Sequence, residues 1–183
     1  LALTRDDMSQ LGQKLAEAMK EIPEFQQMKD QVQITVTGEG LRIELLETER
    51  GMFFESGSPK PSQSGQDLLV TLARELGKLP NRILVEGHTD AKPFAGDGVY
   101  SNWELSGDRA NAARRLMQSS GLRADQVAQV RGFADQKLRT PEDPTHAANR
   151  RVSIIVRYQN APAGDESEAP AEPPAAEKKA ATP

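Results

Sequence analysis

Apolar and polar residues alternate in two short stretches near the start of the chain. Residues 32–36 (VQITV) and 41–45 (LRIEL) have the period of two that is typical of strands with one buried face, and the turn-forming residues between them favour a hairpin. Four other apolar runs of strand length follow along the chain, at residues 52–54, 83–85, 127–132 and 152–158. The pattern therefore predicts a sheet built from segments spread over most of the sequence.

A first helix is predicted from Thr4 to about Lys29. Thr4 and Asp7 resemble a capping pair, and Pro23 should end or kink the helix. Its apolar stripe consists of Leu11, Leu15, Ala18, Met19 and Ile22. Two interpretations remain open: the helix packs on the following domain, or it connects that domain to a membrane or pairs with its copy in a dimer.

Two further helices alternate with the predicted strands. Residues 64–79 have a face of leucines and stop at Pro80, and a second helix begins at Ser101 or Asn102 and ends near Gly121. After the hairpin, the order of elements is strand, helix, strand, helix, strand, strand. This order predicts an α/β (α+β) sandwich with the helices on one face of the sheet.

The clearest candidate site follows the strand at residues 83–85. The run GHTD, residues 87–90, leaves the end of this strand, and apolar spacing continues in the next helix through Leu105, Arg109, Ala112 and Leu116. Asp90 and Arg109 can therefore converge on one pocket. A carboxylate binds an ammonium group and a guanidinium binds a carboxylate, so this pair suits a zwitterionic ligand.

These residues belong to a longer pattern. GHTD, followed by SNWELSGDRA at residues 101–110 and NRRV at 149–152, resembles the OmpA-like peptidoglycan-binding domain over roughly Gly40 to Tyr158. The NWELS run, after a lengthened loop at residues 91–99, resembles the periplasmic part of flagellar stator proteins of the MotB type. The three motifs in this order are far more specific than GHTD alone.

The resemblance implies a β-α-β-α-β-β domain with helices on one face of a mixed sheet. It also implies that Asp90 and Arg109 hold the diaminopimelate of the peptidoglycan stem peptide, which is the kind of zwitterion expected from the residues themselves. We take Thr89, Asn102 and Arg150 as further binding residues.

Three neighbouring residues have competing interpretations. The alternation along the last strand does not decide whether Arg150 or Arg151 faces the pocket, and we favour Arg150. Trp103 is expected to be a core or subunit-contact residue rather than a platform for sugars. His88 is expected to be a structural residue rather than a catalytic one.

Several classes of function are excluded by what the sequence lacks. It has no GxSxG nucleophile elbow and no dinucleotide fingerprint, and its two histidines, without any cysteine, are too few for a zinc site. We therefore expect no enzyme, no cofactor and no metal, which disfavours a peptidoglycan amidase or peptidase. A formal net charge of −4 also argues against nucleic-acid binding.

Composition divides the chain into three parts. Residues 1–30 are expected to form a helical linker, residues 31–160 the OmpA-like domain, and residues 161–183, rich in Ala, Pro and Glu, a disordered tail. No run approaches the roughly 18 apolar residues that span a bilayer. The resemblance implies a periplasmic fragment of a parent protein anchored in the inner membrane.

The leading functional hypothesis is non-catalytic binding of peptidoglycan that anchors a flagellar motor stator to the cell wall. The resemblance implies a homodimer and a MotA-like ion-channel partner. The alternative is an outer-membrane or envelope-integrity protein that binds the same ligand without a motor role.

Overall fold

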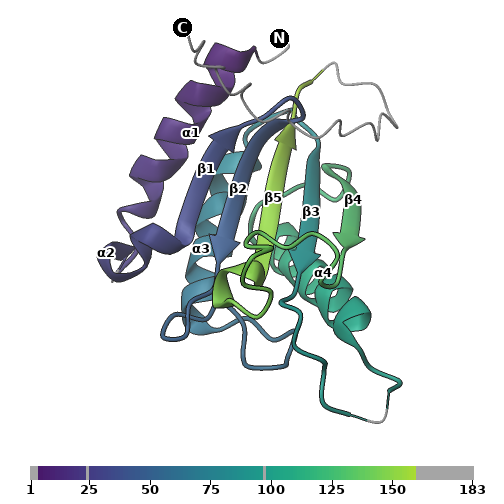
Figure 1. Ribbon diagram of the computed structural model, residues 1–183. Helices are drawn as coiled ribbons and strands as arrows, with labels where there is room; N and C mark the ends of the chain where they lie inside the picture. The colour runs from purple at the N-terminus through teal and green to yellow at the C-terminus, as the bar shows by residue number, and fades with distance from the viewer. Residues whose placement is uncertain (1–3, 24, 97, 160–183) are drawn as a thin grey trace, which may run out of the picture.

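The computed structural model describes residues 4–23, 25–96 and 98–159. Its centre is a five-stranded mixed sheet with the order β1-β2-β5-β3-β4 (Figure 1). The strands are β1 (Val32–Val36), β2 (Gly40–Leu46), β3 (Ile83–His88), β4 (Val127–Gly132) and β5 (Arg151–Arg157). β4 runs parallel to β3, and the other neighbouring pairs are antiparallel. The predicted hairpin is β1–β2, with Ile34 opposite Ile43.

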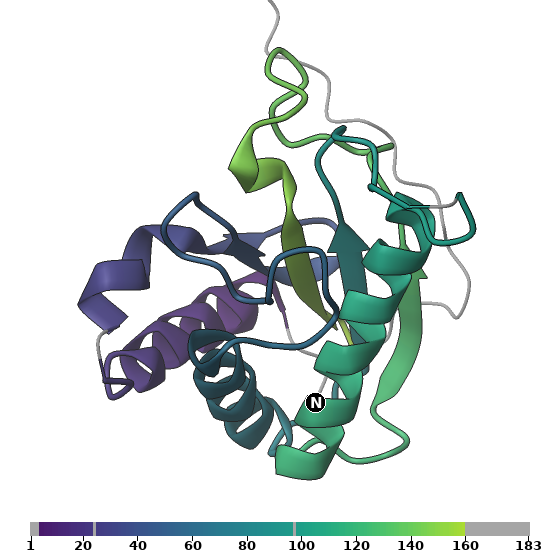
Figure 2. The ribbon, with the colours of Figure 1, turned by 90° about the horizontal axis from the view of Figure 1, so that it is seen from below.

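The main helices lie on one side of this sheet. α3 (Gln63–Leu76) and α4 (Asn102–Ser120) cover one face, and α1 (Arg5–Met19) lies on the same side beside β1 (Figure 2). The shorter elements are α2 (Phe25–Met28) and the 3-10 turns η1 (Lys29–Gln31) and η2 (Ala147–Asn149). The predicted α+β sandwich with helices on one face of a mixed sheet is confirmed.

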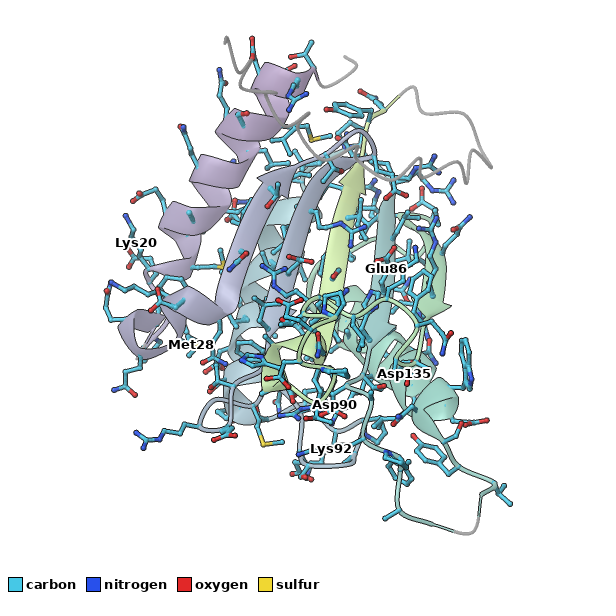
Figure 3. The ribbon with its side chains drawn as sticks, in the orientation of Figure 1. Lys20, Met28, Glu86, Asp90, Lys92 and Asp135 are labelled. Carbon is cyan, nitrogen blue, oxygen red and sulfur yellow. The ribbon has the colours of Figure 1, made fainter. Side chains whose placement is uncertain are left out.

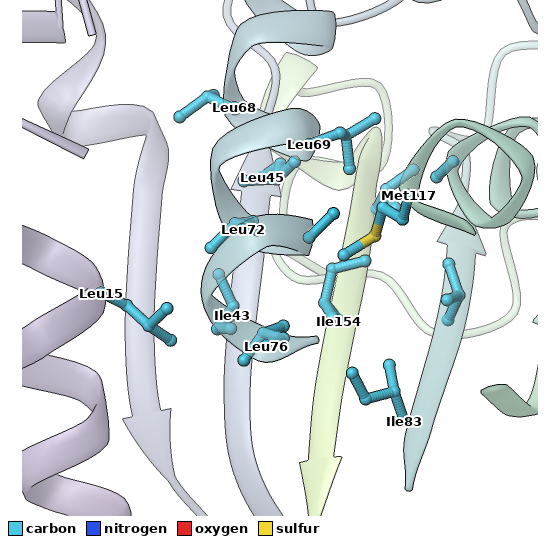
Figure 4. Close-up of a cluster of buried hydrophobic side chains, with 14 of the residues drawn as sticks. Leu15, Ile43, Leu45, Leu68, Leu69, Leu72, Leu76, Ile83, Met117 and Ile154 are labelled. Atoms are coloured by element: carbon cyan, nitrogen blue, oxygen red, sulfur yellow. The ribbon is translucent and has the colours of Figure 1, made fainter. Parts of the chain in front are cut away.

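The core lies between the sheet and these helices. Alternate residues of each strand point toward the helices, as the period of two requires. Figure 4 shows side chains from β2, β3 and β5 meeting those of α1, α3 and α4, among them Ile43, Ile83, Ile154, Leu15, Leu72 and Met117. The leucine face predicted for residues 64–79 therefore belongs to the centre of the core.

The first helix contributes to that core. Thr4 and Asp7 form the predicted capping box, and α1 ends at Met19, ahead of Pro23. Leu15 is only 1% exposed and packs with the sheet and α3. Of the two interpretations of this helix, the structure shows the packed one. Its separate role as a linker over residues 1–30 stays a prediction, and the tail at 161–183 lies outside the described residues.

Residues 52–54 do not form the predicted strand. They make a single bridge between Phe54 and Pro61, within the segment that leads from β2 to α3. Phe53 and Phe54 are buried there, so their apolar character reflects anchoring of a loop to the core. None of the helices in the described part of the chain is long and apolar enough to cross a membrane.

Candidate binding site

The predicted site lies at the end of β3 where α4 begins. Asp90 and Lys92 lie beyond the lower end of the sheet in Figure 3. The first turns of α4 lie against β3 because Gly87 has no side chain: a Cβ there would be 2.0 Å from the carbonyl oxygen of Ser106. This close contact brings Arg109, one turn further along α4, to the same end of the sheet.

Asp90 is bound directly by Arg150. The Arg150 Nη1 donates to Asp90 Oδ2 over 2.6 Å, and the backbone N–H of Lys92 donates to Asp90 Oδ1 over 3.0 Å. The guanidinium of Arg150 also donates from Nε to Glu47 Oε2 over 2.9 Å. Asp90 and Glu47 are both buried, so a single arginine shares its charge between two buried carboxylates.

The pairing of two strands brings Glu47 to Arg150. β2 and β5 are neighbours with Leu46 opposite Arg151, and the ladder continues through the Glu47 N–H, which donates to the Arg150 carbonyl over 3.0 Å. Glu47 also accepts from the Phe54 N–H over 3.3 Å. The site therefore depends on a contact between residues that are 103 positions apart.

Arg109 is buried, and no carboxylate of the described residues is bound to it. Only 4% of it is exposed, and it donates from Nε to the Ser58 carbonyl over 2.9 Å and from Nη2 to the Glu55 carbonyl over 3.2 Å. Its guanidinium carbon lies 5.3 Å from the centroid of the Phe54 ring. Within the described residues, no hydrogen bond is made by its Nη1.

The environment of Arg109 favours an incoming anion. Burial lowers the pKa of its guanidinium from the usual value, because the charged form loses hydration. The nearby carboxylates of Glu47 and Asp90 oppose this shift, while Arg150 adds to it. A carboxylate that reached Nη1 would relieve the cost of keeping this cation buried.

Thr89 and Asn102 act on the backbone around Asp90. The hydroxyl of Thr89 donates to the Asp90 carbonyl over 2.9 Å. The side-chain amide of Asn102 donates to the Lys92 carbonyl over 2.9 Å and, at 3.4 Å, to that of Asp90. Both side chains thus hold the turn that presents the Asp90 carboxylate. The N-cap of α4 is Ser101, which forms a capping box with Glu104.

The structure brings Asp90, Arg109 and Arg150 to one place, and it separates Arg151 from them. Arg151 lies on the opposite face of the sheet, where its Nε is 3.7 Å from Glu44 and its Nη2 donates to the Lys137 carbonyl. Asp90 and Arg109 make no direct bond, but both lie near Arg150 and Glu47.

Sequence reasoning missed three contributions to the site: Glu47, Phe54, and the backbone carbonyls of Glu55 and Ser58. Glu47 follows a predicted strand, as Asp90 does, which was the available signal. Its importance depends on β2 lying beside β5, and no local pattern reveals that pairing.

A second charged cluster lies on the open face of the sheet. Buried Glu86 accepts from Arg42 and Arg131 over 3.0 Å each, and its Oε2 lies 3.4 Å from His88 Nε2. Burial alone would raise the pKa of Glu86, but the hydrogen bond with His88 and the charge of Arg42 lower it to about 2. His88 stacks on Phe133 at 4.9 Å, and burial lowers the pKa of its imidazole. The placement agrees with the structural interpretation of His88.

Trp103 is not a core residue, so that part of the expectation is wrong. It is 55% exposed, although it stands in the first turn of α4. The capping box between Ser101 and Glu104 fixes this turn so that Leu105, two residues later, faces inward and Trp103 faces outward. Its role in a subunit contact stays a prediction.

The arrangement places a buried carboxylate and a buried guanidinium at the same end of the sheet. The Asp90 carboxylate accepts from Arg150 and from the Lys92 N–H, and the Arg109 guanidinium donates to two backbone carbonyls. In the described part of the chain, no three His, Cys, Asp or Glu side chains are grouped so as to hold a metal ion.

Comparison with known proteins relates the chain to one family. The model described as the OmpA family matches residues 53–151, more than half of the chain. Motility protein B of Escherichia coli K12 is 38% identical over 140 residues, which are 76% of this chain and 46% of that protein. The chain thus spans about half the length of this relative.

Solved structures show the same fold. The cell wall anchor of the T6SS from Pseudomonas aeruginosa has a TM-score of 0.61 at 25% identity, covering 79% of this chain and 97% of that one. The periplasmic domain of Helicobacter pylori MotB (residues 90–256) has a TM-score of 0.60 at 22% identity, covering 70% of this chain and 80% of that one.

Proposed function

This chain belongs to the OmpA family, and on that premise we propose that the site at Asp90 and Arg109 binds peptidoglycan without chemical reaction. The ligand is the zwitterionic diaminopimelate of the stem peptide. The observation that carries the proposal is the buried guanidinium of Arg109, which donates to two backbone carbonyls and binds no carboxylate of the described residues.

Each site residue has a distinct part in this binding. Arg109 receives the carboxylate of the ligand through Nη1, and Asp90 receives the ammonium group. Arg150, held by Glu47, keeps the Asp90 carboxylate in place in the absence of ligand. A ligand with only one of the two charges would leave either the buried cation or the buried carboxylate without its new partner.

The domain would anchor a flagellar motor stator to the cell wall. The support is the identity to motility protein B and the shared fold with a bacterial cell wall anchor. In this proposal the parent protein is held in the inner membrane, the domain lies in the periplasm as a homodimer, and a MotA-like protein forms the ion channel with it.

Sedimentation with purified peptidoglycan tests the binding site. We expect Asp90→Ala and Arg109→Ala each to abolish co-sedimentation, because removal of one partner of a desolvated charge pair costs about 2–5 kcal/mol. The matched controls are Asp125→Ala and Arg74→Ala, which alter exposed residues of the same types and should bind like the parent chain.

Two results would contradict the proposal. Wild-type binding by both site variants, with circular dichroism showing that they are folded, would remove the assigned site. Release of soluble peptidoglycan fragments by the parent chain would show that it acts as an enzyme rather than as a binding protein.

A further inference from the structure

A groove runs between the β2–α3 loop and α4, next to the proposed site. Its volume is about 630 Å³, within the range of pockets that hold small ligands. Its main lining residues are Pro59, Lys60 and Pro61 of the loop and Ala112, Arg115 and Leu116 of α4.

Both walls of the groove follow, along the chain, residues that hold or carry the Arg109 side chain. The carbonyl of Ser58, which accepts from Arg109 Nε, immediately precedes the lining residue Pro59. On α4, Ala112 and Leu116 follow Arg109 at the spacing of one helix face. The lining part of α4, from Ala112 to Ser119, spans roughly 10 Å at 1.5 Å per residue, enough for about three extended amino acids.

The groove carries positive charge. Lys60 and Arg115 line it, and no acidic residue of the described chain is among its lining residues. Lys60 lies 3.5 Å from exposed Glu55, a solvent-screened pair of the kind that contributes little. Arg115 is exposed and makes no hydrogen bond or ion pair within the described residues, so its guanidinium is available to an anion.

We propose that this groove binds the acidic part of the stem peptide next to the diaminopimelate, with Arg115 and Lys60 receiving its carboxylate. The inference rests on the proposed function, because the groove extends the ligand seated at Asp90 and Arg109. Prolines, Ala112 and Leu116 supply apolar walls for the short aliphatic side chains of such a peptide. The lining contains two cations, no acidic side chain and no aromatic ring on which a sugar could stack, which favours a peptide carboxylate over a sugar.

Isothermal titration calorimetry with three probes tests the groove. The probes are free diaminopimelate, a stem tripeptide of alanine, γ-linked glutamate and diaminopimelate, and a disaccharide of the glycan without peptide. We expect the parent chain to bind the tripeptide roughly three- to tenfold more tightly than free diaminopimelate. Arg115→Glu should remove this gain and leave the affinity for free diaminopimelate unchanged, whereas the control Arg74→Glu, on exposed α3 surface, should keep both affinities.

Three other outcomes would contradict either the proposed diaminopimelate site at Asp90 and Arg109 or the proposed peptide site in the groove. If diaminopimelate binds but Arg115→Glu keeps the full gain for the tripeptide, the groove is not the peptide site and the proposed function stands. If the disaccharide alone binds and Arg115→Glu abolishes that binding, the groove holds sugar. If free diaminopimelate does not bind but binding of the tripeptide requires Arg115, the proposed role of Asp90 and Arg109 is wrong, and the groove is still supported as a peptide-binding site.

Discussion

Acid should destabilise this domain through Glu86 in a narrow pH range. In the folded chain, Arg42, Arg131 and His88 surround this buried carboxylate and the pKa falls from the ordinary 4.5 to about 2. Because the folded pKa lies below the unfolded one, the folded state favours the ionised form. The stabilisation is fully present above pH 4.5 and is lost as the pH falls toward 2.

The size of the effect follows from that pKa difference. At 1.36 kcal/mol per pH unit, a fall from 4.5 to about 2 corresponds to about 3 kcal/mol of unfolding free energy. This is a large fraction of the stability of a domain of ordinary size. The side chain of Glu86 is 4% exposed, so solvent screening reduces the effect little.

The contribution of Glu86 to the unfolding free energy can be measured by urea unfolding of the parent chain and of Glu86→Gln at a series of pH values. The neutral variant should be less stable at neutral pH, and the difference between the two proteins should shrink by about 3 kcal/mol from about pH 5 to about pH 2. Glu49→Gln, at an exposed position, is the matched control and should leave the acid dependence of the parent chain intact. A difference between parent and Glu86→Gln that stays constant over this range would refute the reasoning.

Two other substitutions test the packing around the site and the first helix. Glu47→Gln should weaken peptidoglycan binding about tenfold and lower the unfolding free energy by about 1–3 kcal/mol, because Arg150 loses a charged acceptor; unchanged co-sedimentation would show that Arg150 needs no such support. Leu15→Ala should lower the unfolding free energy by about 2–5 kcal/mol, because the side chain is almost fully buried; a urea midpoint like that of the parent chain would show that α1 is dispensable to the core.

Local patterns predicted most of the fold. Alternation located β1 and β2, the leucine face located α3, and the Thr4–Asp7 pair marked the start of α1, because these signals are set by neighbours in the sequence. The same reasoning failed at residues 52–54, where buried aromatic residues anchor a loop. It also failed at Trp103, since an apolar residue in a first helical turn can face either way until the cap orients the turn.

The site was predictable only in part, for a physical reason. Asp90 follows β3, and Arg109 lies on α4, the next helix in the chain. Their side chains therefore come to the same end of the sheet without any long-range pairing. The second buried carboxylate, Glu47, meets Arg150 only through the pairing of β2 with β5. A long-range pairing of this kind depends on the whole sheet, and a single sequence without related ones carries no local sign of it.

The position of β5 has a consequence for how the protein is made. β5, the last strand of the described residues, lies in the middle of the sheet, between β2 and β3. A chain that emerges from its N-terminus can form the β1–β2 hairpin and the β3–α4–β4 unit, but each keeps an unpaired strand edge until residues 151–157 arrive. Residue 150 arrives just ahead of them, so a nascent chain stopped short of this point would have neither a closed sheet nor a bound Asp90. During synthesis, the two halves therefore depend on a late, long-range docking step, which slows folding and prolongs the exposure of edges that can join other chains.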